Sequence, residues 1–210
     1  MNYLLNKLNA TFRDKKAYFF IVLIMFCLGI SFGLYTVKYM ETSDKRDLTN
    51  YFSSFANSIG SQPTNYGNLL FEVIKKNILL IIPIFLLGLT FFGAPVILIL
   101  DLLKGFTLGY TFSFIVITFE GKGLGLALAS VIPQNLIYIP CYIALSVISL
   151  SMSTEKFKGK FIKRVKIQSQ FLDGVFSKLI VIIILFAMGI LIETYVSPSL
   201  IRFVAQKFYL

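Results

Sequence analysis

The stretch from Gly93 to Phe119 restricts the fold of this chain more than any other. It is apolar enough and long enough to cross a bilayer, yet it carries the carboxylate of Asp101 and the ammonium of Lys104. Residues three apart share one face of a helix. Each charge costs at least about 2.5–3.5 kcal/mol at the centre of a membrane helix, so such charges generally meet a protein partner or water. We therefore expect this face to point into a helical bundle.

The composition predicts an integral membrane protein. Hydrophobic residues make up 57% of the chain and charged residues 14%, whereas soluble domains are roughly half apolar and about a quarter charged. The apolar runs are continuous rather than alternating, which argues against a β-barrel. The expected fold class is all-α: a polytopic bundle of about five transmembrane helices, accompanied by interfacial amphipathic helices.

Span length and helix breakers divide the chain. A membrane helix needs about 20 apolar residues, and Gly93 and Pro95 suit a reversal between two helices. We expect Pro133 and Pro140 to break the fourth span, and residues 120–123 to form a short loop before it. The expected order is an amphipathic N-terminus 1–16, a retained first span 17–37, a helical segment 38–76, span 77–92, turn and span 93–119, span 124–150, a basic loop 151–178, span 179–196 and a tail 197–210.

The distribution of basic residues predicts the orientation. Four lysines and arginines precede the first span, and seven lie in the 151–178 loop. Cytoplasmic loops carry the excess of positive charge. The N-terminus and the basic loop are therefore expected in the cytoplasm, and segments 38–76 and 197–210 outside it. We interpret the net charge of +10 as a topology signal and an attraction for anionic lipid headgroups at 151–178, rather than as nucleic-acid binding.

The residue inventory argues against an enzyme. The chain has no histidine, which excludes His-based triads and His metal sites. Cys27 and Cys141 lie within apolar runs and are interpreted as packing residues. A membrane carboxyl protease would need two aspartates in facing spans, and Asp101 is the one aspartate within a span. We expect no catalytic residue, no cofactor and no metal.

Helical rise predicts a polar layer in the middle of the membrane. Lys104 would lie about 14 Å from the inner surface, level with Gln134 and Asn135 at about 15–17 Å from the outer one. Asp101 and Glu193 would each lie about a turn away. We hypothesise that Lys104 pairs with Asp101 and contacts Gln134 or Asn135. This intramembrane cluster is either a latch that fixes helix register or a path for an ion or polar headgroup.

Small residues predict where helices approach closely. Gly29 and Gly33 form a Gly-x-x-x-Gly pattern in the first span, and Gly105 and Gly109 repeat that spacing in the third. Glycine at this spacing lets two helix backbones meet. We favour packing within one chain over dimerisation and leave the oligomeric state open.

An aromatic stripe marks the long segment 38–76. Leu48, Tyr51, Phe52 and Phe55 fall on one face of a predicted helix. The stripe has two interpretations: a hairpin that covers the bundle, or a surface on which a partner docks.

Four motifs in a fixed order carry a family resemblance. They are Gly93-Ala94-Pro95, Lys104-Gly105-x-x-x-Gly109-Tyr110, Pro133-Gln134-Asn135 and Glu193-Thr194-Tyr195-Val196-Ser197-Pro198. Together they resemble the stage II sporulation protein M family of endospore-forming bacteria, over essentially the whole chain.

The resemblance implies a role without catalysis. Family members act in the cell membrane during engulfment of the forespore, as the scaffold of a peptidoglycan-degrading machine. They help to recruit stage II sporulation protein P and, through it, stage II sporulation protein D. The rival hypothesis is a small permease or lipid-handling transporter with a polar site around Lys104, because broken helices and mid-membrane polar residues are typical of transport sites.

Overall fold

The computed structural model describes residues 2–50, 65–118, 120–162, 169–201 and 203, with side chains from residue 16 on except 119–122 and 160–178. Every long element in these ranges is a helix, so the expected all-α class is confirmed. The helices are α1 (Asn2–Lys38), α3 (Tyr66–Gly88), α4 (Gly93–Thr118), α5 (Glu120–Ile162) and α6 (Ser169–Leu191), which continues into the π-helix η1 (Ile192–Val196).

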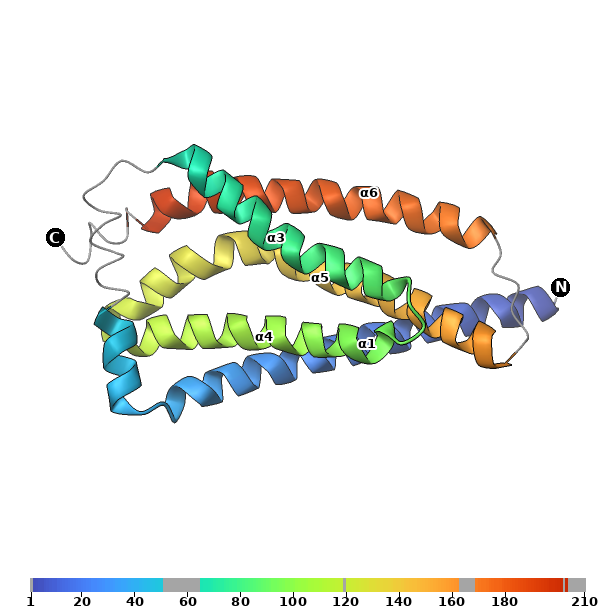
Figure 1. Ribbon diagram of the computed structural model, residues 1–210, viewed down its shortest axis with the longest axis horizontal. Coiled ribbons are helices and arrows are strands. Elements are labelled where there is room, and N and C mark those ends of the chain that lie inside the picture. The colour runs from blue at the N-terminus through green and yellow to red at the C-terminus, as the bar shows by residue number, and fades with distance from the viewer. Residues whose placement is uncertain (1, 51–64, 119, 163–168, 202, 204–210) are drawn as a thin grey trace.

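Successive long helices run in opposite directions along one axis (Figure 1). As a result, α1 begins at one end of the molecule and η1 ends at the other. Helix α1 packs mainly on α4, whereas α3 and α6 lie together on the other side of α5. Helix α5 therefore separates two helix pairs and contacts members of both.

The buried apolar residues show why α5 lies at the centre. One cluster joins Ile84 of α3, Ile97 of α4 and Phe186 of α6 to Tyr142 and Leu145 of α5. Two further clusters join α1 and α4 to other turns of α5, towards either end of the bundle. Because α5 contributes to all three clusters, 61% of the residues in its apolar 18-residue window are buried, compared with 22–28% in the windows of the other apolar helices.

Four helical stretches are long and apolar enough to cross a membrane, within the described residues. They are Lys16–Lys38, Gly93–Thr118, Gly123–Gly159 and Leu179–Ile201, and they define a multi-pass membrane protein. Helix α3 is not among them because its first half carries Glu72, Lys75 and Lys76. It nevertheless runs beside the others and antiparallel to α4 (Figure 1), so a fifth crossing remains a prediction.

Several helix boundaries differ from those expected. Helix α1 is continuous from Asn2, so its first turns prolong the first span rather than forming a separate interfacial helix. Helix α5 begins at Glu120, where a loop was expected, and extends to Ile162; with α6 it makes most of the expected 151–178 loop helical. Pro133 and Pro140 lie inside α5 and do not break it. A proline removes one backbone hydrogen bond, and the turns around both prolines stay helical, with Val131, Tyr138 and Tyr142 buried in the bundle.

The reversal between α3 and α4 lies at residues 89–92, just before the expected Gly93–Pro95 triplet. The amides of Leu89 and Thr90 bond to the carbonyls of Leu86 and Leu87, each at 3.0 Å. The Thr90 hydroxyl also donates to Leu87, at 2.8 Å. Pro95 then falls in the first turn of α4, where its missing N–H costs nothing. The second apolar stretch, expected at 77–92, is the latter part of a helix that begins at Tyr66 and ends at Gly88.

The segment between α1 and α3 is described in part. Residues 42–50 are helical, and Leu48 packs on the cluster around Val37, so this side chain faces the bundle. Tyr51, Phe52 and Phe55 lie outside the described residues. The cap of α3 is Asn65, whose side chain accepts from the Asn68 amide at 3.3 Å.

Candidate functional site

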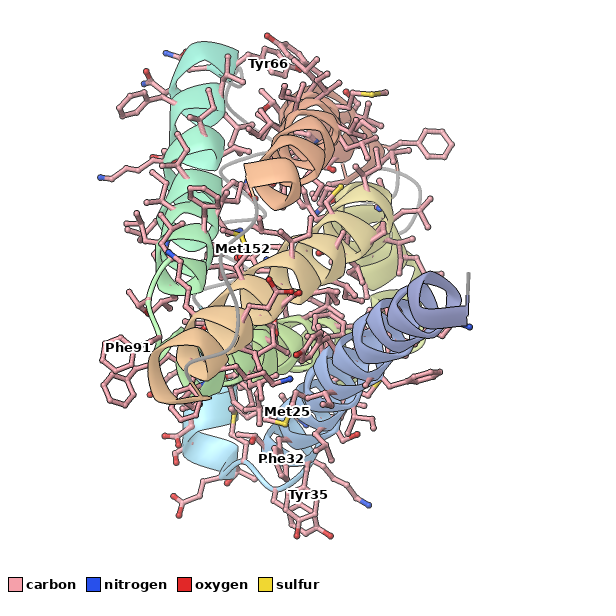
Figure 2. The ribbon with its side chains drawn as sticks, turned by 90° about the vertical axis from the view of Figure 1, so that its right-hand side faces the viewer. Met25, Phe32, Tyr35, Tyr66, Phe91 and Met152 are labelled. Atoms are coloured by element: carbon pink, nitrogen blue, oxygen red, sulfur yellow. The ribbon has the colours of Figure 1, made fainter. Side chains whose placement is uncertain are left out.

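Helices α1 and α4 meet backbone to backbone through four glycines. A Cβ at Gly29 would lie 2.8 Å from the Phe106 nitrogen, and one at Gly33 would lie 2.5 Å from the Tyr110 nitrogen. In return, a Cβ at Gly105 or Gly109 would overlap the backbone of Phe26 or Ile30. The two Gly-x-x-x-Gly patterns therefore interlock within one chain. Phe32 and Tyr35 of α1 point away from this contact (Figure 2) and are 53% and 61% exposed.

The approach of α1 gives α4 a fixed rotation, and Asp101 faces α5. The Asp101 side chain is only 2% exposed, and its Oδ1 accepts a hydrogen bond from the hydroxyl of Ser146 at 2.5 Å. The second carboxyl oxygen, Oδ2, is buried and has no hydrogen-bond partner within the described part of the chain. Asp101 therefore contacts a neutral donor on α5, which corrects the expected pair with Lys104.

Lys104 lies about one turn after Asp101 on α4, and its side chain contacts a different residue of α5. Its Nζ lies 5.3 Å from the centre of the Tyr142 ring, which places the cation over an aromatic face. It is also within electrostatic range of Lys76 and Glu193. No ion pair joins Lys104 to Asp101 in the region that the structure describes. The ammonium therefore contacts Tyr142 of α5 rather than the carboxylate of Asp101.

A second polar group joins α3, α5 and the π-helix. The Lys76 ammonium lies 3.6 Å from the Glu193 carboxylate, and the Asn77 amide donates to the Tyr138 hydroxyl at 3.1 Å. Tyr138 also lies within hydrogen-bonding reach of Glu193. The rings of Tyr66 and Tyr195 stack with centroids 5.5 Å apart. Glu193 stands in η1, and π-turns of this kind frequently occur at functional sites.

Gln134 and Asn135 do not reach Lys104. The Gln134 oxygen accepts from the Ser197 hydroxyl at 2.8 Å, while its nitrogen donates to Ser130 of its own helix. Asn135 donates to Val131 O, also within α5, at 2.7 Å. The expected contact of Lys104 with these amides is thus replaced by its contact with Tyr142, about two turns further along α5.

A bend in α5 explains this shift of register. Near the α4–α5 junction, Gly123 packs on the backbone of Ile115; further on, Ser146 meets Asp101. The two contacts are 14 residues apart on α4, at positions 115 and 101, but 23 residues apart on α5, at positions 123 and 146. The nine additional residues, about 14 Å of helix, form the arch of α5 away from α4 around the two prolines (Figure 1).

The arch aligns the polar side chains of α5 along the bundle. Ser130, Gln134, Tyr138, Tyr142 and Ser146 recur every four residues, and this set is named the α5 polar stripe. Beyond Ser146, the hydroxyls of Ser149 and Ser153 are buried without a partner in the described region, as is the hydroxyl of Tyr142. Buried polar atoms are ordinarily paired, so these three hydroxyls are exceptions within the described core of the bundle.

Sequence reasoning selected Asp101, Lys104, Gln134 and Glu193, but it missed the residues that contact them. These are Lys76, Tyr138, Tyr142, Ser146 and Ser197, and Asn77 in turn contacts Tyr138. The four-residue spacing of the α5 polar stripe was a readable signal, because such spacing keeps side chains on one helix face. No described group of three or more Cys, Asp or Glu side chains could hold a metal ion.

The fold and this buried polar cluster define a multi-pass helical membrane protein in which α5 connects two helix pairs. The family model described as stage II sporulation protein M matches residues 22–198. The chain therefore belongs to the stage II sporulation protein M family and is a sporulation membrane protein, which confirms the family expected from the motifs. Comparison with curated proteins and with solved structures gives no match.

Proposed function

We propose that this protein is a non-enzymatic membrane scaffold that recruits peptidoglycan-degrading enzymes during engulfment of the forespore. The observation that carries the proposal is the family match over residues 22–198. The proposed partners are stage II sporulation protein P and, through it, stage II sporulation protein D. The protein would lie in the cell membrane with its N-terminus in the cytoplasm and its C-terminus outside.

The segment between α1 and α3 is the proposed docking surface. Lys38 ends α1 and Asn65 caps α3, so about 26 residues connect two helices at one end of the bundle. A connection of that length exceeds the usual helix–helix loop of about 2–8 residues, and residues 42–50 form a short helix within it. Leu48 anchors the first part of the segment to the bundle, and Tyr51, Phe52 and Phe55 supply the aromatic side chains that interfaces favour.

Co-purification tests this role. Changing Tyr51, Phe52 and Phe55 together to serine should abolish recovery of stage II sporulation protein P with the tagged protein, as should deletion of residues 44–60. A matched control changes Ser53, Ser54 and Asn57 of the same segment to alanine and should retain the partner. Equal partner recovery from the aromatic variant and the control, at equal membrane abundance, would overturn the proposed docking surface.

A second candidate function is transport of an ion or polar headgroup through the bundle. It is favoured by Lys104 and Asp101 within α4 and by the buried hydroxyls of Ser149 and Ser153, which have no hydrogen-bond partner within the described residues. Lys104→Met separates the two interpretations, with Lys158→Met as the matched change at an exposed lysine. Normal abundance with lost engulfment supports a path, whereas loss of folded protein shows that the lysine is a structural latch.

A further inference from the structure

A cavity of about 440 Å³ lies between α3 and α6, and all of its lining is apolar. Its floor is formed by Leu145, Ile182 and Phe186, which are at most 6% exposed. Its walls include Ile82 and Ile183, which are 49% and 61% exposed. A buried floor between exposed walls describes a groove that opens sideways, between two helices that share few contacts.

A basic side chain stands at one end of this groove. Phe85 is the last groove residue of α3, and Leu89 follows one turn later, about 6 Å along the axis. The Leu89 carbonyl accepts a hydrogen bond from Lys156 Nζ at 2.8 Å. An ammonium has three donors, so Lys156 can bind a second acceptor while it holds α3. Lys158, two residues on, is exposed.

The size and apolar lining of the groove indicate which kind of molecule can bind there. A membrane helix is about 10–12 Å across with its side chains, so even two turns of it would fill roughly twice the cavity. A single flexible hydrocarbon chain fits a narrow apolar channel without polar groups to satisfy. The apolar groove leads to a cation at the end where α3 meets α4, and a molecule with a hydrocarbon tail and a negative head complements both features.

We propose that the α3–α6 groove binds one anionic phospholipid, with an acyl chain over Leu145 and Phe186 and its phosphate at Lys156. The bound lipid would fill the space between α3 and α6 and hold these helices at a fixed separation. This site is independent of the proposed scaffold function, because the groove is formed by α3, α5 and α6, whereas the proposed docking surface is the segment between α1 and α3.

Photo-crosslinking in nanodiscs tests the site with the full chain. The probe is phosphatidylglycerol with a photoreactive group in its acyl chain, diluted into phosphatidylcholine, with adducts located by mass spectrometry. Adducts should concentrate on groove residues of α3, α5 and α6. Ile183→Trp should fill the groove and reduce these adducts about fivefold, the equivalent of ~1 kcal/mol. Ile184→Trp, next to it but outside the groove, should leave them unchanged.

Two further variants keep the result interpretable. Ile82→Trp fills the groove from α3, with Ile78→Trp as its control one turn away, so a folding defect in one variant does not decide the outcome.

Lys156→Gln should lower the preference for phosphatidylglycerol over phosphatidylcholine about fivefold, the ~1 kcal/mol expected of one lysine near a lipid surface, whereas Lys158→Gln should not. Adducts spread evenly over lipid-facing residues, or a protein helix crosslinked in the groove of the cellular protein, would overturn the proposal.

Discussion

At the scale of single residues, the glycines of α1 and α4 determine how the first layer of the bundle forms. Gly29, Gly33, Gly105 and Gly109 remove the side chains that would otherwise hold the two backbones apart. Lipid tails are as apolar as leucine, so close backbone packing replaces the hydrophobic effect as a source of helix association in a membrane. The rotation of α4 that presents Asp101 to α5 depends on this contact.

Replacing Gly33 by leucine should therefore destabilise the folded protein by about 3 kcal/mol, because the new side chain would overlap the backbone of Phe106 and Tyr110. Unfolding in mixed micelles measures the change. Gly67→Leu is the matched control, because a Cβ at Gly67 meets only the Asn65 side chain, at 3.4 Å; its stability should change by less than about 0.5 kcal/mol. Equal effects of the two substitutions would contradict the packing described.

Residue patterns predicted this contact but not the partners of the buried charges. The spacing of the glycines is a local property of the sequence. It predicts a close helix contact without showing which helices meet. The partner of Lys104 depends instead on how α5 is bent, and the sequence marks the prolines without giving the direction or depth of the bend. A straight α5 would place Gln134 opposite Lys104; the arch places Tyr142 there. The same shift brings Ser146 to Asp101.

At the scale of elements, η1 is where α6 is joined to α3. The π-turn at Ile192–Val196 directs Glu193 to Lys76 and Tyr195 to Tyr66. These contacts bridge helices that otherwise leave an open groove between them. The end of the bundle that holds η1 is thus closed by polar and aromatic contacts, and the groove lies among residues nearer the α3–α4 turn.

A double-mutant cycle on Lys76→Met and Glu193→Gln measures this junction. The pair should show a coupling of about 0.5–1 kcal/mol in unfolding free energy, since the lysine is 66% exposed and the carboxylate 16%. The same cycle with Lys75→Met, an exposed neighbour on α3, should be additive. Additivity at Lys76 as well would show that the ion pair does not join α3 to η1.

At the scale of the whole molecule, the long helices of the described residues alternate in direction. This alternation decides which side of the membrane each connecting segment would occupy. Hydropathy identifies four candidate crossings among the described residues, and α3 is not among them because of its charged residues. The structure places Lys76 beside Glu193 and Asn77 beside Tyr138, so two polar residues of α3 contact protein, whereas Glu72 and Lys75 are exposed. With the proposed cytoplasmic N-terminus, a crossing by α1 would place the segment before α3 outside the cell, where wall hydrolases act, and a crossing by α3 would return the chain to the cytoplasm.

Cysteine accessibility across α3 tests that arrangement most directly. In a background with Cys27→Ser and Cys141→Ala, single cysteines replace Asn68, near the start of α3, and Thr90, just after its end. An impermeant maleimide applied to intact cells should label the cysteine at 68 at once and the one at 90 only after permeabilisation. Labelling of both from the same side would show that α3 does not cross the membrane, and labelling of the cysteine at 68 only after permeabilisation would contradict the outward placement of the segment proposed to bind the partner.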